Sequence, residues 1–180
     1  MKRKIVIGVV TAAVLIGGGT ATAVALADDD GGGTARAAAS RVTVGEAVAA
    51  GRKAVPGTVT EAELDEEDGR LRWELEVYGA DKVWRDVTVD AESGKVLGKR
   101  VDRDEDDSRS APRTVSVSLE EAAGAALKSV PGVVTSVELE GRHGGAAHWE
   151  TDVRGKDGGE HELSVDALTG VVTADGRDED

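Results

Sequence analysis

The stretch that decides the fold is Asp90-Ala91-Glu92-Ser93-Gly94-Lys95-Val96, because the chain repeats it as Asp166-Ala167-Leu168-Thr169-Gly170-Val171-Val172. The two copies begin 76 positions apart, and a segment of alternating apolar and polar residues precedes each. Each copy is typical of a strand, a tight turn and a second strand, since Asp accepts hydrogen bonds from turn amides and Gly readily adopts a positive φ. We therefore assign a structural role to the Asp and Gly of both copies: Asp90, Gly94, Asp166 and Gly170.

A helix is predicted upstream of each turn motif. Thr43-Val44-Gly45-Glu46 and Ser118-Leu119-Glu120-Glu121 have the form of a capping box, in which a hydroxyl and a Glu satisfy backbone amides at the helix start. Apolar residues recur behind both caps at helical spacing. The pattern is weaker in the first copy, where two glycines cost about 1 kcal/mol each relative to Ala. Both helices are expected to end at Val-Pro-Gly, residues 55–57 and 130–132.

Strands follow each predicted helix. The clearest is 70–78, whose strict alternation indicates one buried and one solvated face. Its counterpart, 147–153, carries Trp149 where the first copy has Trp73. The remaining strands are predicted at 58–64, 82–90 and near Val96 in the first copy, and at 133–140, 160–166 and near Val171 in the second. In the strand 133–140 the alternation places four side chains on one face: Val133, Thr135, Val137 and Leu139.

The duplication predicts an α+β fold of two tandem small modules, each with one helix packed on a four-stranded antiparallel sheet, after an N-terminal signal or anchor helix. The copies align at an offset of 75 through the helix and first strand, and at 76 from the Trp onward, so one residue is inserted in the second hairpin loop. We expect two successive modules rather than one continuous sheet. Trp73 and Trp149 are expected to anchor the cores beneath the helices.

The N-terminus has the order of a secretory signal peptide: basic residues, an apolar run and a tail of small residues. Its cleavage site is predicted at Ala25, Ala27 and Asp28. The alternative is an uncleaved membrane anchor, because residues 5–27 are uncharged and about long enough to span a bilayer. Both alternatives predict a secreted or membrane-anchored protein outside the cytoplasmic membrane, since basic residues stay inside.

Composition and motifs together divide the chain into six predicted segments. The predicted segments are a signal peptide or anchor (1–27), a flexible linker (28–41), a first module (42–101), an acidic linker (102–114), a second module (115–175) and an acidic tail (176–180).

The chain is acidic, with a formal net charge of −13. Phosphate would be repelled, so nucleic acid is excluded as a partner, and cationic partners or loosely held divalent cations are favoured. The absence of Cys excludes disulfides and thiolate metal sites.

The order of these motifs resembles the PepSY domain: a capped helix ending in Val-Pro-Gly, a Trp-Glu strand, and the Val-x-Val-Asp-Ala-x-(Ser/Thr)-Gly-x-Val turn. Residues 43–98 and 118–173 each resemble one copy. The family is similar to part of the propeptide of thermolysin-like metallopeptidases, and it also occurs alone or in tandem in secreted and membrane-anchored bacterial proteins. The resemblance implies a role in inhibiting or regulating a peptidase outside the cell.

No catalytic constellation is visible in the sequence, so we predict no enzyme activity, catalytic residue or cofactor. The histidines are His143, His148 and His161. A pair from His148 and His161 with a neighbouring carboxylate has the ligand types for Zn²⁺, but the spacing fits no metal signature, and we predict no metal site. The acidic runs lack the loop spacing of an EF-hand and are interpreted as solvated linker and tail.

Two functions follow as hypotheses. The first is a non-enzymatic extracytoplasmic binding module that inhibits or regulates a peptidase in trans, through an exposed sheet edge or face. The second is a cell-envelope sensor or scaffold that binds cations or a cationic partner. A membrane is expected as a partner only through an uncleaved N-terminal segment, and the sequence does not indicate an oligomeric state.

Overall fold

The structure is a computed structural model that describes residues 40–102, 111–141 and 146–174. The first repeat contains α2 (Val44–Ala54), β1 (Gly57–Glu67), β2 (Arg70–Gly79), β3 (Trp84–Asp90) and β4 (Val96–Val101). The second contains α3 (Leu119–Ser129), β5 (Gly132–Glu140), β6 (His148–Gly155), β7 (Glu160–Asp166) and β8 (Val172–Ala174). The α+β class and the order of one helix and four antiparallel strands in each repeat agree with the prediction.

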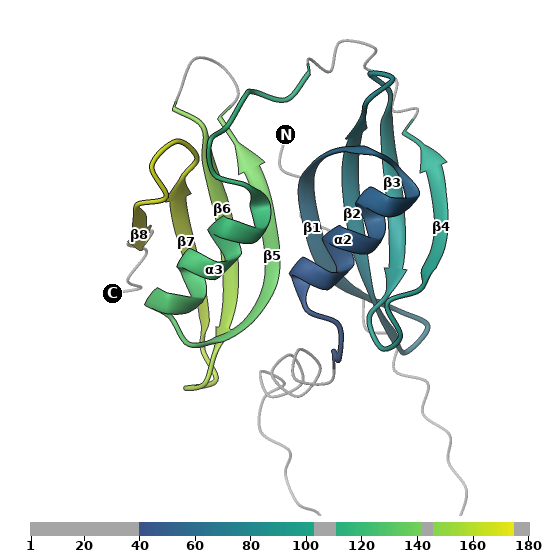
Figure 1. The fold of residues 1–180 in the computed structure, drawn as a ribbon. Helices are drawn as coiled ribbons and strands as arrows, with labels where there is room; N and C mark the ends of the chain where they lie inside the picture. The colour runs from purple at the N-terminus through teal and green to yellow at the C-terminus, as the bar shows by residue number, and fades with distance from the viewer. Residues whose placement is uncertain (1–39, 103–110, 142–145, 175–180) are drawn as a thin grey trace, which may run out of the picture.

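The prediction of two separate sheets is wrong. The strands form one eight-stranded sheet in the order β4-β3-β2-β1-β5-β6-β7-β8, with both helices on one face (Figure 1). The repeats join where β1 pairs antiparallel with β5, and Ala62 lies opposite Val137. These two residues occupy equivalent positions in the repeats, so a pseudo-two-fold axis passes between them. The junction covers the strand edge that each repeat alone would leave unpaired.

Both helices begin at the predicted capping boxes. The backbone N–H of Thr43 donates to Glu46 at 2.8 Å, and the backbone N–H of Ser118 donates to Glu121 at 2.8 Å. The buried helix residues are Val44, Ala47, Val48 and Gly51 in α2, and Leu119, Ala122, Ala123 and Ala126 in α3. Five of these eight residues are Gly or Ala, and such small side chains let the helices approach the sheet closely.

The two tryptophans have equivalent surroundings. Each is 1% exposed beneath the helix layer. The indole N–H of Trp73 donates to the carbonyl of Val42 at 2.9 Å, and that of Trp149 donates to the carbonyl of Val117 at 2.9 Å. Both acceptors lie just before a helix cap, so each tryptophan fixes the entry of its helix as well as filling its core.

The repeated turn motifs close the β3–β4 and β7–β8 connections. The Asp90 carboxylate accepts from the N–H and hydroxyl of Ser93, at 2.7 and 2.6 Å. Asp166 does the same with Thr169, at 2.8 Å each. These bonds lower the pKa of both carboxyls, the side-chain bonds being the largest cause. Gly94 and Gly170, in the same turns, have φ of 70° and 74°, a conformation that favours Gly.

The prediction of which side chains of β5 share one face of the sheet is wrong for the first half of the strand. Val134 and Val137 are the buried residues, and a β-bulge shifts the register between Val134 and Ser136. The same shift occurs between Val59 and Glu61 in β1. A bulge places one extra residue on the strand and reverses the alternation beyond it, which a simple period-two pattern does not show.

Candidate functional site

The candidate site is the face of the sheet opposite the helices, which we call the carboxylate face. Side chains alternate along a strand, so where Trp73 and Leu75 point toward the helices, Glu74 and Glu76 point away from them. The neighbouring strands contribute in the same way. The carboxylates of this face are Glu61, Glu63, Glu74, Glu76, Asp86, Glu138, Glu150, Asp152 and Glu162.

Many of these carboxylates lie opposite one another on paired strands. The like-charged pairs in register are Glu61 with Glu76 and Glu138, Glu63 with Glu74, Glu76 with Asp86, Glu138 with Glu150, and Asp152 with Glu162. Like charges in this arrangement destabilise a sheet. These repulsions by themselves oppose the pairing of the strands that carry them.

Burial, with the crowding of negative charge as the next cause, raises the pKa of two of these groups. Burial raises the pKa of Asp152 to about 6, with the charge of Glu162 as the next cause. Burial likewise raises the pKa of Glu63, and the charges of Asp65 and Glu74 add to the effect. Because these pKa values are higher in the folded than in the unfolded chain, the native state holds more protons between the two values, and stability falls as the pH rises through that window.

Arginines at the margins of the face offset part of its charge. Among the described residues, these arginines form ion pairs between Arg72 and Glu67, Arg100 and Asp86, and Arg154 and Glu160. Near Arg100, single oxygen atoms of Glu76, Asp86 and Asp102 lie within 4.8 Å of one another. Such oxygens suit a hard divalent cation, although the guanidinium of Arg100, 2.9 Å from Asp86, already neutralises one of them.

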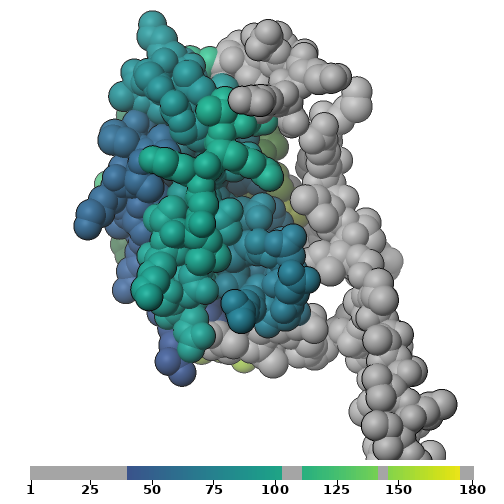
Figure 2. Space-filling model, turned by 90° about the vertical axis from the view of Figure 1, so that its right-hand side faces the viewer, coloured from purple at the N-terminus to yellow at the C-terminus, as the bar shows by residue number. Residues whose placement is uncertain are grey.

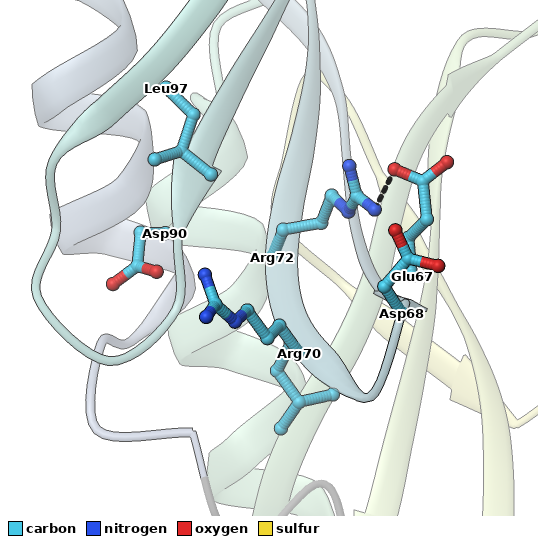
Figure 3. A pocket seen from close by; sticks show the side chains of 7 residues that line it. Glu67, Asp68, Arg70, Arg72, Asp90 and Leu97 are labelled. Atoms are coloured by element: carbon cyan, nitrogen blue, oxygen red, sulfur yellow. Dashed lines mark hydrogen bonds and ion pairs between the residues drawn. The ribbon is translucent and has the colours of Figure 1, made fainter.

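A cleft of about 460 Å³ lies at the hairpin end of the first repeat. Figure 3 shows Arg70 and Asp90 on opposite sides of this cleft, with Leu97 of β4 beside them. The equivalent positions for Arg70 and Leu97 in the second repeat are Ala146 and Thr173. The mixed lining of cation, carboxylate and leucine is therefore a feature of the first repeat.

The edge strand β4 is a second candidate surface. Every residue of β4 is exposed, including Leu97 at 60% and Val101 at 44%. Figure 2 looks onto this side of the molecule, where β4 runs along the surface. The strand at the opposite edge, β8, has only three residues. A six-residue edge offers a row of backbone groups long enough for another strand to pair with.

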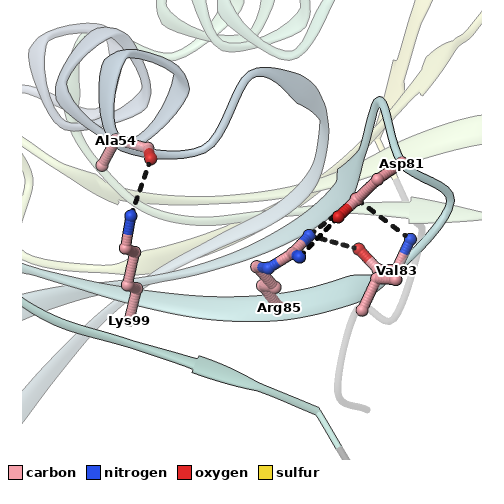
Figure 4. A network of polar contacts seen from close by, with 5 residues as sticks. All are labelled: Ala54, Asp81, Val83, Arg85 and Lys99. Atoms are coloured by element: carbon pink, nitrogen blue, oxygen red, sulfur yellow. Dashed lines mark hydrogen bonds and ion pairs between the residues drawn. The ribbon is translucent and has the colours of Figure 1, made fainter.

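One polar contact joins this edge strand to α2, and a second group of contacts lies in the nearby β2–β3 turn (Figure 4). The Lys99 ammonium donates to the carbonyl of Ala54 at the end of α2, at 3.3 Å. In the nearby β2–β3 turn, Arg85 forms two hydrogen bonds to the carboxylate of Asp81, at 2.8 and 2.6 Å. The Arg85 bond lowers the pKa of Asp81 to about 2.

The residues singled out in the sequence fall in different places. Trp73, Trp149 and the Asp and Gly of the turns serve the core and the connections, and Asp90 also borders the cleft. His148 lies opposite Asp166, whereas His161 lies opposite Val153 at the other end of the β6–β7 ladder. His161 bonds instead to Asp157 at 3.0 Å. The structure therefore does not bring these two histidines together.

Several predictions lie outside the described residues. They are the leader with Ala25, Ala27 and Asp28, His143, most of the two linkers, and the acidic tail. Neither helix of the described part meets the length and hydropathy that a membrane span requires.

The carboxylate face itself was only partly visible in the sequence. The alternation in 70–78 indicates a solvated face, and Glu-x-Glu or Glu-x-Asp patterns recur at 61–63, 74–76 and 150–152. The register that sets these groups opposite one another depends on strand pairing, which no local pattern specifies.

Comparison with known proteins gives two kinds of likeness. Residues 41–100 and 116–175 each match the family described as the peptidase propeptide and YPEB domain, PepSY. Among solved structures, the CD1622 protein of Clostridium difficile 630 is similar at 16% identity and a TM-score of 0.47, over 74% of this chain and 91% of that one. YpmB of Bacillus subtilis is similar at 20% identity and a TM-score of 0.30, over 71% and 91%.

No curated protein matches the sequence significantly. The two family matches together span well over half of the chain and coincide with the two structural repeats. The chain therefore belongs to the PepSY family and carries two copies of its domain.

Proposed function

We propose that this protein is a non-catalytic extracytoplasmic binding module that inhibits or regulates a peptidase in trans. Membership of the PepSY family supports a regulatory or binding role. The leader pattern in residues 1–27 supports export. The single observation that carries the proposal is β4, a fully exposed edge strand at the end of the sheet.

Binding at β4 would add an extended segment of the peptidase to the sheet. Main-chain hydrogen bonds supply affinity in this mode, and the exposed Leu97 and Val101 contact the partner's side chains. Lys99 and Arg100 place positive charge on the same strand. Arg100 is paired with Asp86, so Lys99 is the charge on this edge that opposes pairing between two copies of β4.

The test uses the full chain with a C-terminal tag to recover partners from the culture medium and the cell envelope. Recovery of a peptidase whose rate falls when the protein is added supports the proposal. Leu97→Asp should weaken the inhibition about tenfold or more, because it places a charge in the pairing surface. Leu168→Asp is the matched control, since Leu168 is also 60% exposed but lies in the β7–β8 turn. Equal effects of the two variants would show that β4 is not the surface that binds the peptidase.

A cell-envelope sensor or scaffold without a peptidase target is the second candidate. The carboxylate face favours it, because its oxygens suit cations or a cationic partner. Stoichiometric binding of a divalent ion in calorimetry, with no peptidase recovered, would support this function. The N-terminal sequence of the mature protein distinguishes the two placements: a start at Asp28 in the medium indicates secretion, and an intact leader in the membrane fraction indicates an anchor.

A further inference from the structure

We propose that the cleft beside β4 captures the C-terminal end of an extended polypeptide whose last side chain is apolar. This capture rests on the function proposed above, because the captured end belongs to the segment that adds to β4. The cleft is lined by the β1–β2 hairpin, by the end of β3 and by Leu97 of β4 (Figure 3). Its volume of about 460 Å³ lies within the range of ligand-binding clefts.

Arg70 is the cationic group of this cleft with unused hydrogen-bond donors. The other arginine of the lining, Arg72, forms an ion pair with Glu67. Arg70 is exposed, and no hydrogen bond or ion pair joins its guanidinium to another residue in the described part of the chain. A guanidinium presents a planar fork of N–H donors that matches a carboxylate. Arg70 is therefore the group of the cleft that can bind a carboxylate from outside the chain.

The cleft also offers an acceptor and an apolar contact. Both hydrogen bonds from Ser93 to Asp90 end on Oδ1, so Oδ2 can accept from a further donor. Leu97 is 60% exposed beside them. The last residue of a polypeptide presents the complementary groups close together, namely a carboxylate, a backbone N–H and a side chain. A simple anion would meet Asp90 as a like charge and offer it no donor, which favours a chain end as the occupant.

A β-bulge in β4 places Leu97 at this cleft. Thr88 of β3 pairs with Gly98 of β4. The next residue of β3, Val89, pairs with Val96, so Leu97 is an extra residue without a partner in this ladder. The equivalent ladder, β7 with β8, has no such shift. Bulges at sheet edges re-aim a side chain or end strand pairing. The bulge therefore makes the cleft a specific feature of the first repeat, at the point where an added strand would stop pairing.

The direction of pairing determines which end of a bound segment reaches the cleft. The neighbouring strands of this sheet pair antiparallel. A strand that continues this pattern on β4 runs from Val101 toward Val96, so its C-terminal end arrives at the bulge. Strands lie about 4.8 Å apart, and each extended residue adds about 3.3 Å. Two or three residues beyond the last pair can therefore cross β4 and meet the side chain of Arg70.

The test measures binding of two short labelled peptides to the full chain by fluorescence anisotropy. Both peptides alternate Thr and Val and end in Leu, and they differ only in having a free C-terminal carboxylate or a C-terminal amide. The carboxylate peptide should bind about tenfold more tightly, because it alone forms a charge-assisted bond with Arg70. This preference should shrink as salt rises, since the site is open to solvent. Equal affinities, or no binding of either peptide, would overturn the proposal.

Substitution of Arg70 shows whether this side chain causes the preference. Arg70→Gln should weaken the carboxylate peptide about tenfold and leave the amide peptide within about twofold. Arg70→Lys should keep only part of the preference, because Lys lacks the planar fork. Lys128→Gln is the matched control, since it removes one positive charge from the last turn of α3 in the second repeat. A preference that survives Arg70→Gln, or that falls equally in Lys128→Gln, would reject the site.

Val101→Asp separates capture of the chain end from pairing at β4. Val101 is 44% exposed at the end of β4 farther from the cleft. Its replacement should weaken both peptides by the same factor. If Val101→Asp weakens both peptides but their affinities are equal, capture of the carboxylate is rejected and pairing at β4 stands. If Val101→Asp has no effect while the preference still depends on Arg70, pairing at β4 is rejected and the carboxylate site stands.

Discussion

The two repeats build the same backbone around different core residues. In the first repeat a Cβ at Gly51 of α2 would stand 2.4 Å from Leu75 Cδ1 of β2. The equivalent residues of the second repeat are Ala126 and Thr151, both fully buried. A larger helix residue thus accompanies a smaller strand residue. At this contact between helix and sheet, the sizes of the two residues therefore change in opposite directions from one repeat to the other, as close packing requires.

The two repeats are most alike at their tryptophans, and substituting these residues should give the largest loss of stability. Trp73→Ala and Trp149→Ala should each lower the free energy of unfolding by about 3–5 kcal/mol, because each removes a large buried side chain. Each also removes an indole hydrogen bond to the segment before a helix. Urea unfolding followed by circular dichroism measures both losses, which should be similar.

Trp73→Phe and Trp149→Phe are the matched controls, since they keep an aromatic ring and lose only the N–H and part of the volume. All variants should unfold in a single transition, because the sheet is continuous through the pairing of β1 with β5. Unchanged melting in either Ala variant would contradict the equivalence of the two tryptophans. Two separate transitions would show that the repeats unfold independently.

Gly51→Ala tests the volume exchange directly. Ala favours a helix by about 1 kcal/mol over Gly, but overpacking a core costs about 1–3 kcal/mol. The variant should therefore be less stable by about 1 kcal/mol, because its new methyl meets Leu75. In a Leu75→Val background, which lacks that Cδ1 atom, the same substitution should stabilise by up to about 1 kcal/mol. The reversal of sign, measured by chemical denaturation, is the decisive result, and the same sign in both backgrounds would refute the exchange.

The core of the second repeat contains one buried polar side chain on β6, that of Thr151. Its hydroxyl is buried and has no hydrogen-bond partner within the described residues. Thr151→Val should raise the free energy of unfolding by about 1 kcal/mol, because it removes an unsatisfied polar group at nearly constant volume. Thr135→Val is the control, since that hydroxyl donates to the carbonyl of Asp152 at 3.3 Å and its removal should not stabilise. A loss of stability in Thr151→Val would imply a partner for its hydroxyl.

Local features of the fold could be predicted because their signals are local. Capping boxes, Val-Pro-Gly stops and the Asp and Gly of the turns each act within a few residues, and the structure shows the capping boxes and the turn bonds. Trp73 and Trp149 could be placed in the core because an alternating strand can bury only one of its faces.

The junction of the repeats could not be predicted in the same way. Pairing of β1 with β5 uses backbone groups, so a strand with a paired edge and one with an exposed edge have the same side-chain alternation. The bulges at Thr60 and Thr135 were missed for a related reason, because one extra residue leaves no distinct composition. The carboxylate face depends on both features, which is why its charges were visible and their arrangement was not.

The contact between the helices should give the smallest effect, and it has no counterpart under the pseudo-two-fold symmetry. Arg52 of α2 lies 2.6 Å from Glu120 of α3, with side chains 39% and 31% exposed. The equivalent positions are Leu127 and Gly45, which cannot form an ion pair. Partly exposed pairs contribute about 0.2–1 kcal/mol, so a double-mutant cycle with Arg52→Leu and Glu120→Gln should give a coupling in that range.

The salt dependence of this coupling energy distinguishes an ion pair from apolar packing between the two helices. The coupling should fall as ionic strength rises, because the pair is partly exposed and its charges are screened, whereas the apolar contacts of the helices with the sheet are not. Arg52→Leu alone should cost little, because Leu127 occupies the same helical position in the second repeat. A coupling that persists at high salt would mean that the two helices meet through packing, and that the repeats are joined by their helix layer as well as by the β1–β5 ladder.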